Sequence, residues 1–380
     1  MFKKRRWLGV VLIVIAGIVA YFPLKKAIQA NASRNELAQK KETFSGNSDN
    51  LKRTAILSAF GSPLQPDKNN IWCSSFQLAW NEMKDTVIKE PLQVMGAEAL
   101  CVQLNSGRQT KKDLLPESYY AIAGNVSDGI IQTIQTEMAS RFPAVPIPQF
   151  NPDDQYIAYA YLETYIQFTK AFLEVTEPLL FHDTSGKTTP VKSFGIQDGF
   201  LKEHEPLCKQ VEVLYCKLDD QYKATEYALD LCRDTQPYQI VVAVTERKDT
   251  LESTYNQLQD KIKDFPTHKD YEWLAQFQDN DILKVPDMFW TLTHRFKELE
   301  GAPLTNINAN GMPISAAMQQ ISFRLDRAGV TLKSSSLMCV SAMPRDFIFD
   351  KPFLLYLKKR DASQPFFVTW VDNAELLIPF

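Results

Sequence analysis

Two hydrophobic periodicities occupy different parts of the chain, and their order is the strongest constraint on its fold. Apolar residues recur at helical spacing in three segments, at 74–88, 127–142 and 251–265. Strand-like runs form a second group, at 157–168, 209–218, 227–234, 238–246 and 349–373. Because most of these runs follow one another without intervening crossover helices, we expect antiparallel pairing. The sequence predicts an α+β fold in which early helices pack on large, mostly antiparallel sheets.

The N-terminus, "MFKKRRWLGVVLIVIAGIVAYFPLKK", has an apolar run from Trp7 to Leu24 after the basic cluster Lys3–Arg6. As a helix this run would be roughly 27 Å long, which is enough to cross the hydrocarbon core of a membrane. We therefore predict a signal anchor in residues 1–24. A cleaved signal peptide, with a small-residue site at Ala30–Ala32, is the alternative. The basic cluster favours a cytoplasmic N-terminus, so the rest of the chain would lie outside the cytoplasm.

Residues 25–50 are polar, poor in large apolar side chains, and interrupted by Ser, Gly and Asn, which predicts a flexible linker. Residues 51–380 contain neither a long linker of this kind nor a repeat of fixed period, so we expect them to form one domain. That domain would be anchored to the membrane on its periplasmic or extracellular side. It would be secreted if the N-terminus is cleaved.

The charge pattern excludes a nucleic-acid partner. The formal net charge is −3 and the isoelectric point is about 5.9, so the chain has no overall basic field. The sequence also lacks a basic stripe interleaved with aromatic residues, which is typical of nucleic-acid binding. We expect protein partners, and the membrane through the N-terminal helix.

Motifs that support catalysis are absent from the sequence. It has no G-x-S-x-G, no H-E-x-x-H and no glycine loop that would cradle a phosphate. It has no C-x-x-C, and its four histidines are scattered at His182, His204, His268 and His294. We therefore predict that the protein is not an enzyme, binds no metal and carries no cofactor.

The six cysteines leave two readings open in an exported domain. Cys216 and Cys232 lie in runs that fit neighbouring antiparallel strands, and Cys208 is close to them in the sequence. A cross-strand disulfide fits an oxidising compartment, whereas a domain of this size can also bury free thiols. Spacing alone does not decide between these two readings.

A small, hydroxyl-rich segment near the C-terminus separates two runs that look like buried strands. The first run ends at Ser322–Leu325, and Gly329 follows it. The second is very apolar and has Asp350, Lys351 and Pro352 near its start. Small polar residues between buried strands predict an exposed loop that proteases can reach.

The stretch "FIFDKPFLLYL" (347–357) resembles the signature strand of the serpins, which are suicide protease inhibitors. Other stretches resemble serpin segments and occur in the family's order: "NIWCSSFQL" (70–78), "AYAYLETYIQF" (158–168), "ILKVPDMF" (282–289) and "AMQQISFRLDRAG" (317–329). The resemblance extends over about residues 50–377. On this resemblance the chain is identified as a divergent, bacterial-type serpin with an N-terminal membrane anchor.

The resemblance implies a mechanism for the exposed loop. In serpins a protease cuts the loop, which then inserts as an extra strand into the large sheet and distorts the acyl-linked protease. By this resemblance the hinge comprises Gly329, Val330 and Leu332. The bond that a protease would cut lies between Met343 and Pro344.

The resemblance also implies a polar cluster that lets the strands of the large sheet part. Its positions correspond here to Ser74, Gln77, Tyr159 and Gln319. Only Ser74 keeps the family's residue type, because the other three replace a Ser, an Asn and a His. The chain before Tyr159 is also short for the family's helices, so the resemblance predicts that the helix covering the front of the sheet is missing.

Departures from the family weaken the expectation of inhibition. Arg327 stands where inhibitory members favour Glu, and Leu332 and Lys333 stand in a run that is normally rich in alanine. The resemblance thus implies a serpin-type protein with impaired or lost suicide inhibition, which acts as a binding module or a protease substrate. An active inhibitor of a serine or cysteine protease, with Met343 as the recognised residue, is the alternative. A third reading is an unrelated α+β envelope protein.

Overall fold

The computed structural model describes the chain from residue 42 to its end, except for residues 144, 152, 165, 167, 198–204, 266–271, 310 and 328–344. Residues 43–380 form one compact unit. Residues 43–50, which we assigned to the linker, therefore belong to the folded unit. The predicted signal anchor, residues 1–24, lies outside the described residues. Within the described part of the chain, no helix is long and apolar enough to cross a membrane.

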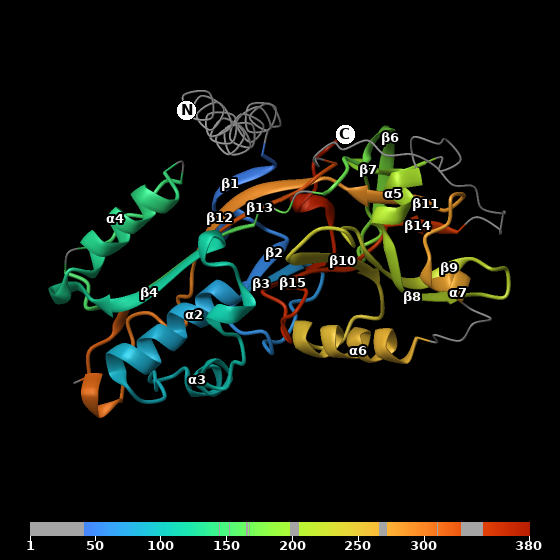
Figure 1. Ribbon diagram of the computed structural model, residues 1–380. Coiled ribbons are helices and arrows are strands. Elements are labelled where there is room, and N and C mark those ends of the chain that lie inside the picture. Colours follow the sequence, from blue (N-terminus) through green and yellow to red (C-terminus); the bar gives the residue numbers. More distant parts are fainter. Residues whose placement is uncertain are drawn as a thin grey trace, which may run out of the picture. The chain divides into compact units, whose positions relative to one another are not determined.

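A five-stranded sheet holds most of the segments singled out by the sequence. Its strands, in spatial order, are β1 (Phe44–Asn47), β12 (Met288–Arg295), β13 (Ile314–Leu325), β5 (Tyr156–Thr164) and β4 (Tyr119–Asn125). The pairs β12–β13 and β4–β5 are antiparallel, whereas β1–β12 and β13–β5 are parallel. Figure 1 shows β12 and β13 running side by side through the molecule.

Helices cover both faces of this sheet. On one face lie α2 (Ser74–Glu82), which continues as the π-helical turn η2 (Met83–Ile88), and α3 (Glu98–Asn105). On the other face lies α4 (Ile130–Arg141). Figure 1 shows α4 and α2 on opposite sides of β4.

The packing of α4 corrects one expectation from the resemblance, which left the helix over the front of the sheet missing. Ile134 and Met138 of α4 pack with Tyr159, Tyr161 and Met318 of the sheet. Neighbouring residues on a strand point to opposite faces, and Ala158 and Ala160 accordingly pack with α2. The short chain therefore still supplies a helix to that face.

A second sheet has seven strands. Their order is β2 (Thr54–Leu57), β3 (Asn69–Cys73), β16 (Phe367–Val371), β15 (Phe353–Lys359), β10 (Tyr238–Val244), β9 (Ala224–Asp230) and β8 (Glu212–Leu218). α6 (Leu251–Asp264) packs on it through Leu251, Tyr255 and Leu258. A capping box formed by Thr250 and Ser253 starts this helix by satisfying its first free backbone N–H groups.

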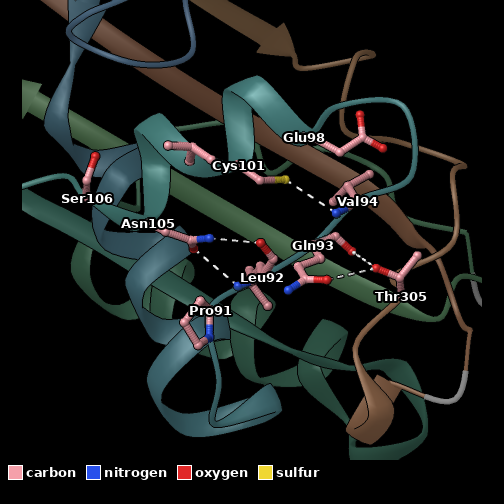
Figure 2. Close-up of a pocket in the computed structure, with 10 residues that line it drawn as sticks. Pro91, Leu92, Gln93, Val94, Glu98, Cys101, Asn105, Ser106 and Thr305 are labelled. Carbon is pink, nitrogen blue, oxygen red and sulfur yellow. Dashed lines mark hydrogen bonds between the residues drawn. The ribbon is translucent and has the colours of Figure 1, made fainter.

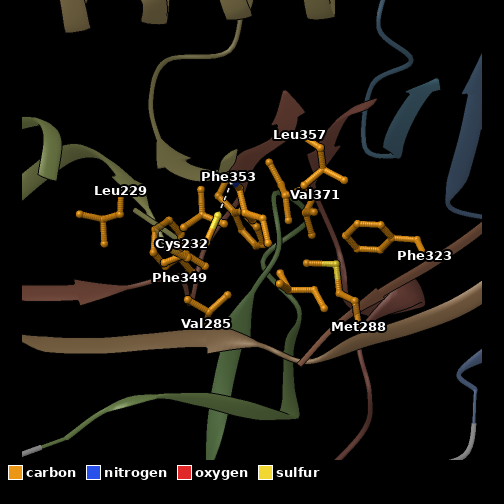
Figure 3. Close-up of a cluster of buried hydrophobic side chains, with 14 of the residues drawn as sticks. Leu229, Cys232, Val285, Met288, Phe323, Phe349, Phe353, Leu357 and Val371 are labelled. Atoms are coloured by element: carbon orange, nitrogen blue, oxygen red, sulfur yellow. Dashed lines mark hydrogen bonds between the residues drawn. The ribbon is translucent and has the colours of Figure 1, made fainter. Parts of the chain in front are cut away.

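The third sheet has four strands and lies where the C-terminal loop returns. Their order is β14 (Asp346–Ile348), β11 (Ile282–Pro286), β7 (Thr188–Ile196) and β6 (Leu173–His182). The largest apolar core joins all three sheets, because it contains Phe323 of β13, Leu357 of β15 and Val285 of β11 (Figure 3). Two short helices, α5 (Glu205–Gln210) and α7 (Glu272–Ala275), precede β8 and β11.

The predicted α+β class is confirmed, as is helix at 74–88, at 127–142 and at 251–265. Most described strand pairs are antiparallel, including β8–β9. The run predicted as strand at 209–218 instead starts inside α5. The five described cysteines (Cys73, Cys101, Cys208, Cys216 and Cys232) are all buried free thiols, so Cys216 and Cys232 do not form the cross-strand disulfide.

Candidate functional site

The structure describes both ends of the predicted loop. The loop residues named by the sequence lie outside the described residues: Gly329, Val330, Leu332, Met343 and Pro344. β13, which leads into the segment 328–344, belongs to the five-stranded sheet, and β14, which follows it, belongs to the four-stranded sheet. The segment therefore connects two different sheets.

The N-terminal end of the segment is held by polar contacts of Arg324, Asp326 and Arg327. Arg324 donates from Nε to Asp326 Oδ2 over 2.8 Å, and its guanidinium lies 4.9 Å from the ring centre of Phe289. The carbonyl of Arg327 accepts a hydrogen bond from the backbone N–H of Phe172 at 3.0 Å. The Arg327 side chain is 3.7 Å from Glu174, but both groups are about half exposed, so this ion pair adds little stability.

The C-terminal end of the segment is held in the interior. The side chain of Arg345 is 1% exposed and that of Asp281 is 0% exposed, and Nη2 and Oδ2 are 2.6 Å apart. The guanidinium also donates to the carbonyls of Leu274, at 2.9 Å, and Gln276, at 2.5 Å. The backbone of Arg345 accepts from Ile282 N–H at 2.9 Å. A buried charge with this many partners fixes the position at which the segment enters β14.

β5 and β13 are direct neighbours, and we call the line between them the seam. They pair in parallel from Ile157 opposite Ala316 to Thr164 opposite Phe323. No other strand lies between them in the described sheet. A strand that entered the sheet here would have to break the whole seam, because each strand needs about 4.8 Å of width.

On the α2 face of the seam lies a buried polar group. Gln319 donates from Nε2 to the carbonyl of Cys73, at 3.0 Å, and to Ser75 Oγ, at 2.8 Å. Two atoms beside this pair, Ser74 Oγ and Gln319 Oε1, are buried without a hydrogen-bond partner in the described structure. Each such atom costs about 1–3 kcal/mol of desolvation free energy that no hydrogen bond offsets.

On the α4 face, a hydrogen bond crosses the seam. Tyr159 of β5 donates from its hydroxyl to Gln320 Oε1 of β13 over 3.3 Å. The Tyr159 ring meets Phe150 edge-on, with ring centres 5.8 Å apart. Burial raises the pKa of Tyr159 far above its ordinary value, so the phenol stays protonated and acts as a donor.

The Gln77 side chain points away from the seam, toward the end of α3. Its Nε2 donates to the carbonyl of Leu104 at 2.6 Å and to Asn81 Oδ1 at 3.0 Å, at the end of α3. A Cβ at Gly107 would approach the Gln77 amide to 2.3 Å, so the glycine leaves room for this contact. The four residues of the predicted cluster are therefore split: Ser74 and Gln319 lie on the α2 face, Tyr159 lies on the α4 face, and Gln77 faces α3.

Sequence reasoning missed four residues that define this site: Ser75, Gln320, Asp281 and Arg345. The sequence did hold a signal for Gln320. Gln319 and Gln320 are consecutive in an apolar strand, and neighbouring residues of a strand point to opposite faces, so each face receives one glutamine. Arg345 precedes the apolar run "FIF", but its partner is 64 positions away in the sequence. No local pattern relates two residues at that separation.

The described residues show neither a metal centre nor an activated cysteine. They contain no group of three or more His, Cys, Asp or Glu side chains that could hold a metal ion. Burial raises the pKa of the Cys73 and Cys216 thiols to about 11 and that of Cys208 to about 12. These thiols are protonated at neutral pH and are therefore poor nucleophiles.

A cleft of about 500 Å³ lies between residues 91–94 and α3 (Figure 2). Asn105 holds one wall by donating from Nδ2 to the carbonyl of Leu92 at 2.8 Å, and Val94 N–H donates to the thiol of Cys101 at 3.3 Å. Val102 lines the cleft and is 69% exposed. The polar side chains here hold the wall in place, and the remaining lining is mostly apolar.

Comparison with known proteins gives only distant likenesses. No family model matches the sequence, and no curated protein matches it. The structure resembles native protease nexin-1 with heparin (11% identity) and Serpin48 of the insect Tenebrio molitor (12%); each alignment covers 80% of this chain and 92% of the other, with a TM-score of 0.47. Mouse protein-Z dependent protease inhibitor is 14% identical over 66% of this chain and 64% of the other, with a TM-score of 0.43.

These likenesses are to serpins, the family that the sequence resembles. All TM-scores are below 0.5 and all identities are at or below 14%. These likenesses therefore describe a similarity of fold and say nothing about activity.

Proposed function

We propose that this chain is a serpin-type protein that presents residues 328–344 to a protease or another protein ligand, with suicide inhibition impaired or lost. Residues 1–24 would tether it to the outer side of a membrane. The proposal is supported by the agreement between the sequence resemblance and the strand positions. The signature stretch 347–357 includes residues of β14 and β15, and residues 317–325 of the stretch before the segment 328–344 lie on β13.

The observation that carries the proposal is the closed seam between β5 and β13. One side-chain hydrogen bond crosses the seam on the α4 face, from Tyr159 of β5 to Gln320 of β13. On the other face, Gln319 ties β13 to Ser75 of α2. In an inhibitor of this type, the cut loop must open the seam before the acyl-enzyme hydrolyses. The Tyr159–Gln320 bond and the paired backbones of β5 and β13 must break first, which slows opening and favours hydrolysis of the acyl-enzyme.

The alternative, an active inhibitor with Met343 as the recognised residue, is favoured by a different observation. Ser74 Oγ and Gln319 Oε1 are buried beneath the seam without partners in the described structure. The desolvation cost of these two atoms is not offset by hydrogen bonds, so it makes the closed sheet less stable. Opening the sheet could give the atoms partners and remove this cost. The two candidates therefore differ in whether cutting the loop stabilises the molecule.

One experiment separates the two candidates. The protein is incubated with trypsin-, chymotrypsin- and elastase-like proteases, and the products are followed by SDS gels and by thermal melting. Under the proposal we expect nicked chain, no SDS-stable covalent complex, and a melting temperature that nicking leaves nearly unchanged. A covalent complex that Met343→Asp abolishes would establish the inhibitor instead.

A second set of variants identifies the limiting defect. Val330→Thr, Leu332→Ala and Lys333→Ala together restore small residues after the hinge. If the hinge limits insertion, nicking this triple variant should raise the melting temperature markedly. If the seam limits it, the rise should appear only when Gln320→Ala removes the bond to Tyr159 as well.

The tether has its own test. The cell fraction that contains the protein is determined, and the N-terminal residue of the mature chain is sequenced. Recovery with the membrane and an intact N-terminus supports the anchor. A soluble protein that begins at Ser33 would instead establish a cleaved signal peptide.

A further inference from the structure

Residues 43–50, which we call the strap, run along the outer edge of β12 over its whole length. The contacts are Thr43 N–H to the Phe289 carbonyl (2.7 Å), parallel pairing from Phe44 opposite Trp290 to Asn47 opposite Thr293, Ser48 Oγ with His294 Nδ1 (2.7 Å), and Asp49 Oδ2 with Lys297 Nζ (2.6 Å). The strap thus follows β12 from Phe289 to His294 and makes one further contact, to Lys297, beyond the end of the strand. It makes the five-stranded sheet end on β1 instead of β12.

Without the strap, β12 would be an open edge. Its other side pairs with β13 over eight positions, from Met288 to Arg295, so only the strap side could accept another strand. Trp290 and Leu292 are 1% and 0% exposed, and they give the strand one strongly apolar face. A long, regular edge of this kind is a template for pairing with another chain.

The strap itself is a poor template. β1 has only four residues, and Ser45, Gly46 and Asn47 are exposed. Gly46 has φ 150°, a backbone conformation that side chains other than glycine rarely adopt. A short, polar, irregular strand at the margin of a sheet discourages further pairing.

We propose that the strap is a removable cover over a self-pairing edge, and that its displacement lets β12 pair with β12 of a second copy. Antiparallel pairing of one strand with itself is self-complementary, so no further partner is required. A register centred on Leu292 places Phe289 opposite Arg295, Trp290 opposite His294, and Thr291 opposite Thr293. This register opposes no like charges. It joins the four strands that remain in each copy, β12, β13, β5 and β4, into one sheet.

The test uses the full chain with residues 43–50 replaced by a Gly/Ser segment of equal length. The matched control has the same replacement at residues 33–40, inside the predicted linker. Mass in solution is measured by light scattering under identical conditions, and near-UV circular dichroism reports whether the fold is kept. We expect the strap variant to be folded with a doubled mass, whereas the control keeps the mass of the unmodified chain.

A peptide of residues 42–50, added in excess, should return the strap variant to the monomer mass, and a scrambled peptide should not. Hydrogen exchange adds a local readout. The amides of residues 288–295 that do not bond to β13 should be protected in the dimer and should exchange when it is diluted. A folded strap variant that stays monomeric overturns the proposal. So does a dimer that the peptide does not dissociate.

Gly46→Pro provides a milder displacement if the full replacement unfolds the protein. Proline cannot adopt the φ of Gly46 and lacks the N–H group, so it should release β1 while Ser48 and Asp49 remain in the chain. We expect a dimer fraction well above that of the unmodified chain. Adding Ser45→Cys and Thr291→Cys, whose disulfide would link β1 to its register partner on β12, should abolish this dimer. If Gly46→Pro is folded and no more dimeric than the unmodified chain, the strap is not a removable cover.

Discussion

Arg345 and Asp281 form a buried ion pair at the point where the C-terminal loop enters the four-stranded sheet. Arg345 Nη2 is 2.6 Å from Asp281 Oδ2, and Nε is 3.1 Å from Oδ1, so two parallel hydrogen bonds join the groups. The guanidinium also lies near the rings of Trp273 and Phe347, at 5.6 and 5.1 Å. This pair holds β14 against β11, while the other end of the loop continues from β13.

Arg345→Met should be strongly destabilising, because it leaves the Asp281 carboxylate buried without its counter-ion. We expect the free energy of unfolding to fall by about 3–5 kcal/mol. Urea denaturation measures this change. Adding Asp281→Leu removes the second charge and should restore most of the loss; a single variant within about 1 kcal/mol of the unmodified chain would show that the pair has no such role.

Replacing Ser74 and replacing Ser75, its neighbour, should change the stability of the protein in opposite directions. Ser74→Ala removes a buried hydroxyl that has no partner, so we expect the free energy of unfolding to rise by about 1 kcal/mol. Ser75→Ala removes the acceptor of Gln319 Nε2 and should lower it by about 1–2 kcal/mol. Thermal and urea unfolding of the two variants compare them directly, and equal losses would contradict the assignment of Ser74 as unpaired.

His294 should make the protein sensitive to acid. Burial lowers its pKa to about 4, from an ordinary 6.5, while Asp49 raises it and Lys297 lowers it by smaller amounts. Between about pH 6.5 and 4, the unfolded chain binds a proton that the folded chain does not, so falling pH favours unfolding. We expect a loss of about 2 kcal/mol across this window.

The pH effect is checked by urea denaturation at several pH values from neutral to about 4. His294→Gln should remove most of this pH dependence, because the amide does not titrate. His182→Gln, which changes an exposed ring, is the matched control. An unchanged profile in His294→Gln would mean that other groups cause the acid sensitivity.

Trypsin provides a sharp test of the loop. Two residues that it recognises lie close together in the sequence, Lys333 in the predicted loop and Arg345 just after it. We expect limited proteolysis to cut after Lys333 and to spare the bond after Arg345, because the Arg345 side chain is 1% exposed. Mass spectrometry of the fragments reads both sites, and comparable cutting after Arg345 would contradict the buried anchor.

The sequence predicted more of the fold than of the site. Helix 251–265 was readable because its apolar spacing lies within one short segment. The resemblance grouped Gln77, Tyr159 and Gln319 with Ser74 in one cluster. The structure separates them, because Gln77 faces α3 and Tyr159 lies on the α4 side of the sheet. Side-chain direction follows from strand pairing, which a single sequence does not contain.

By itself the sequence determined the α+β class and the main helices and strands, because apolar periodicity acts between residues close together in the chain. Only the tertiary structure decided that α4 covers the front of the sheet, that Arg345 pairs with Asp281, and that residues 43–50 close the edge of β12. Each of these depends on which distant strands become neighbours. That choice is made by the packing of the whole core, where many weak contacts act together.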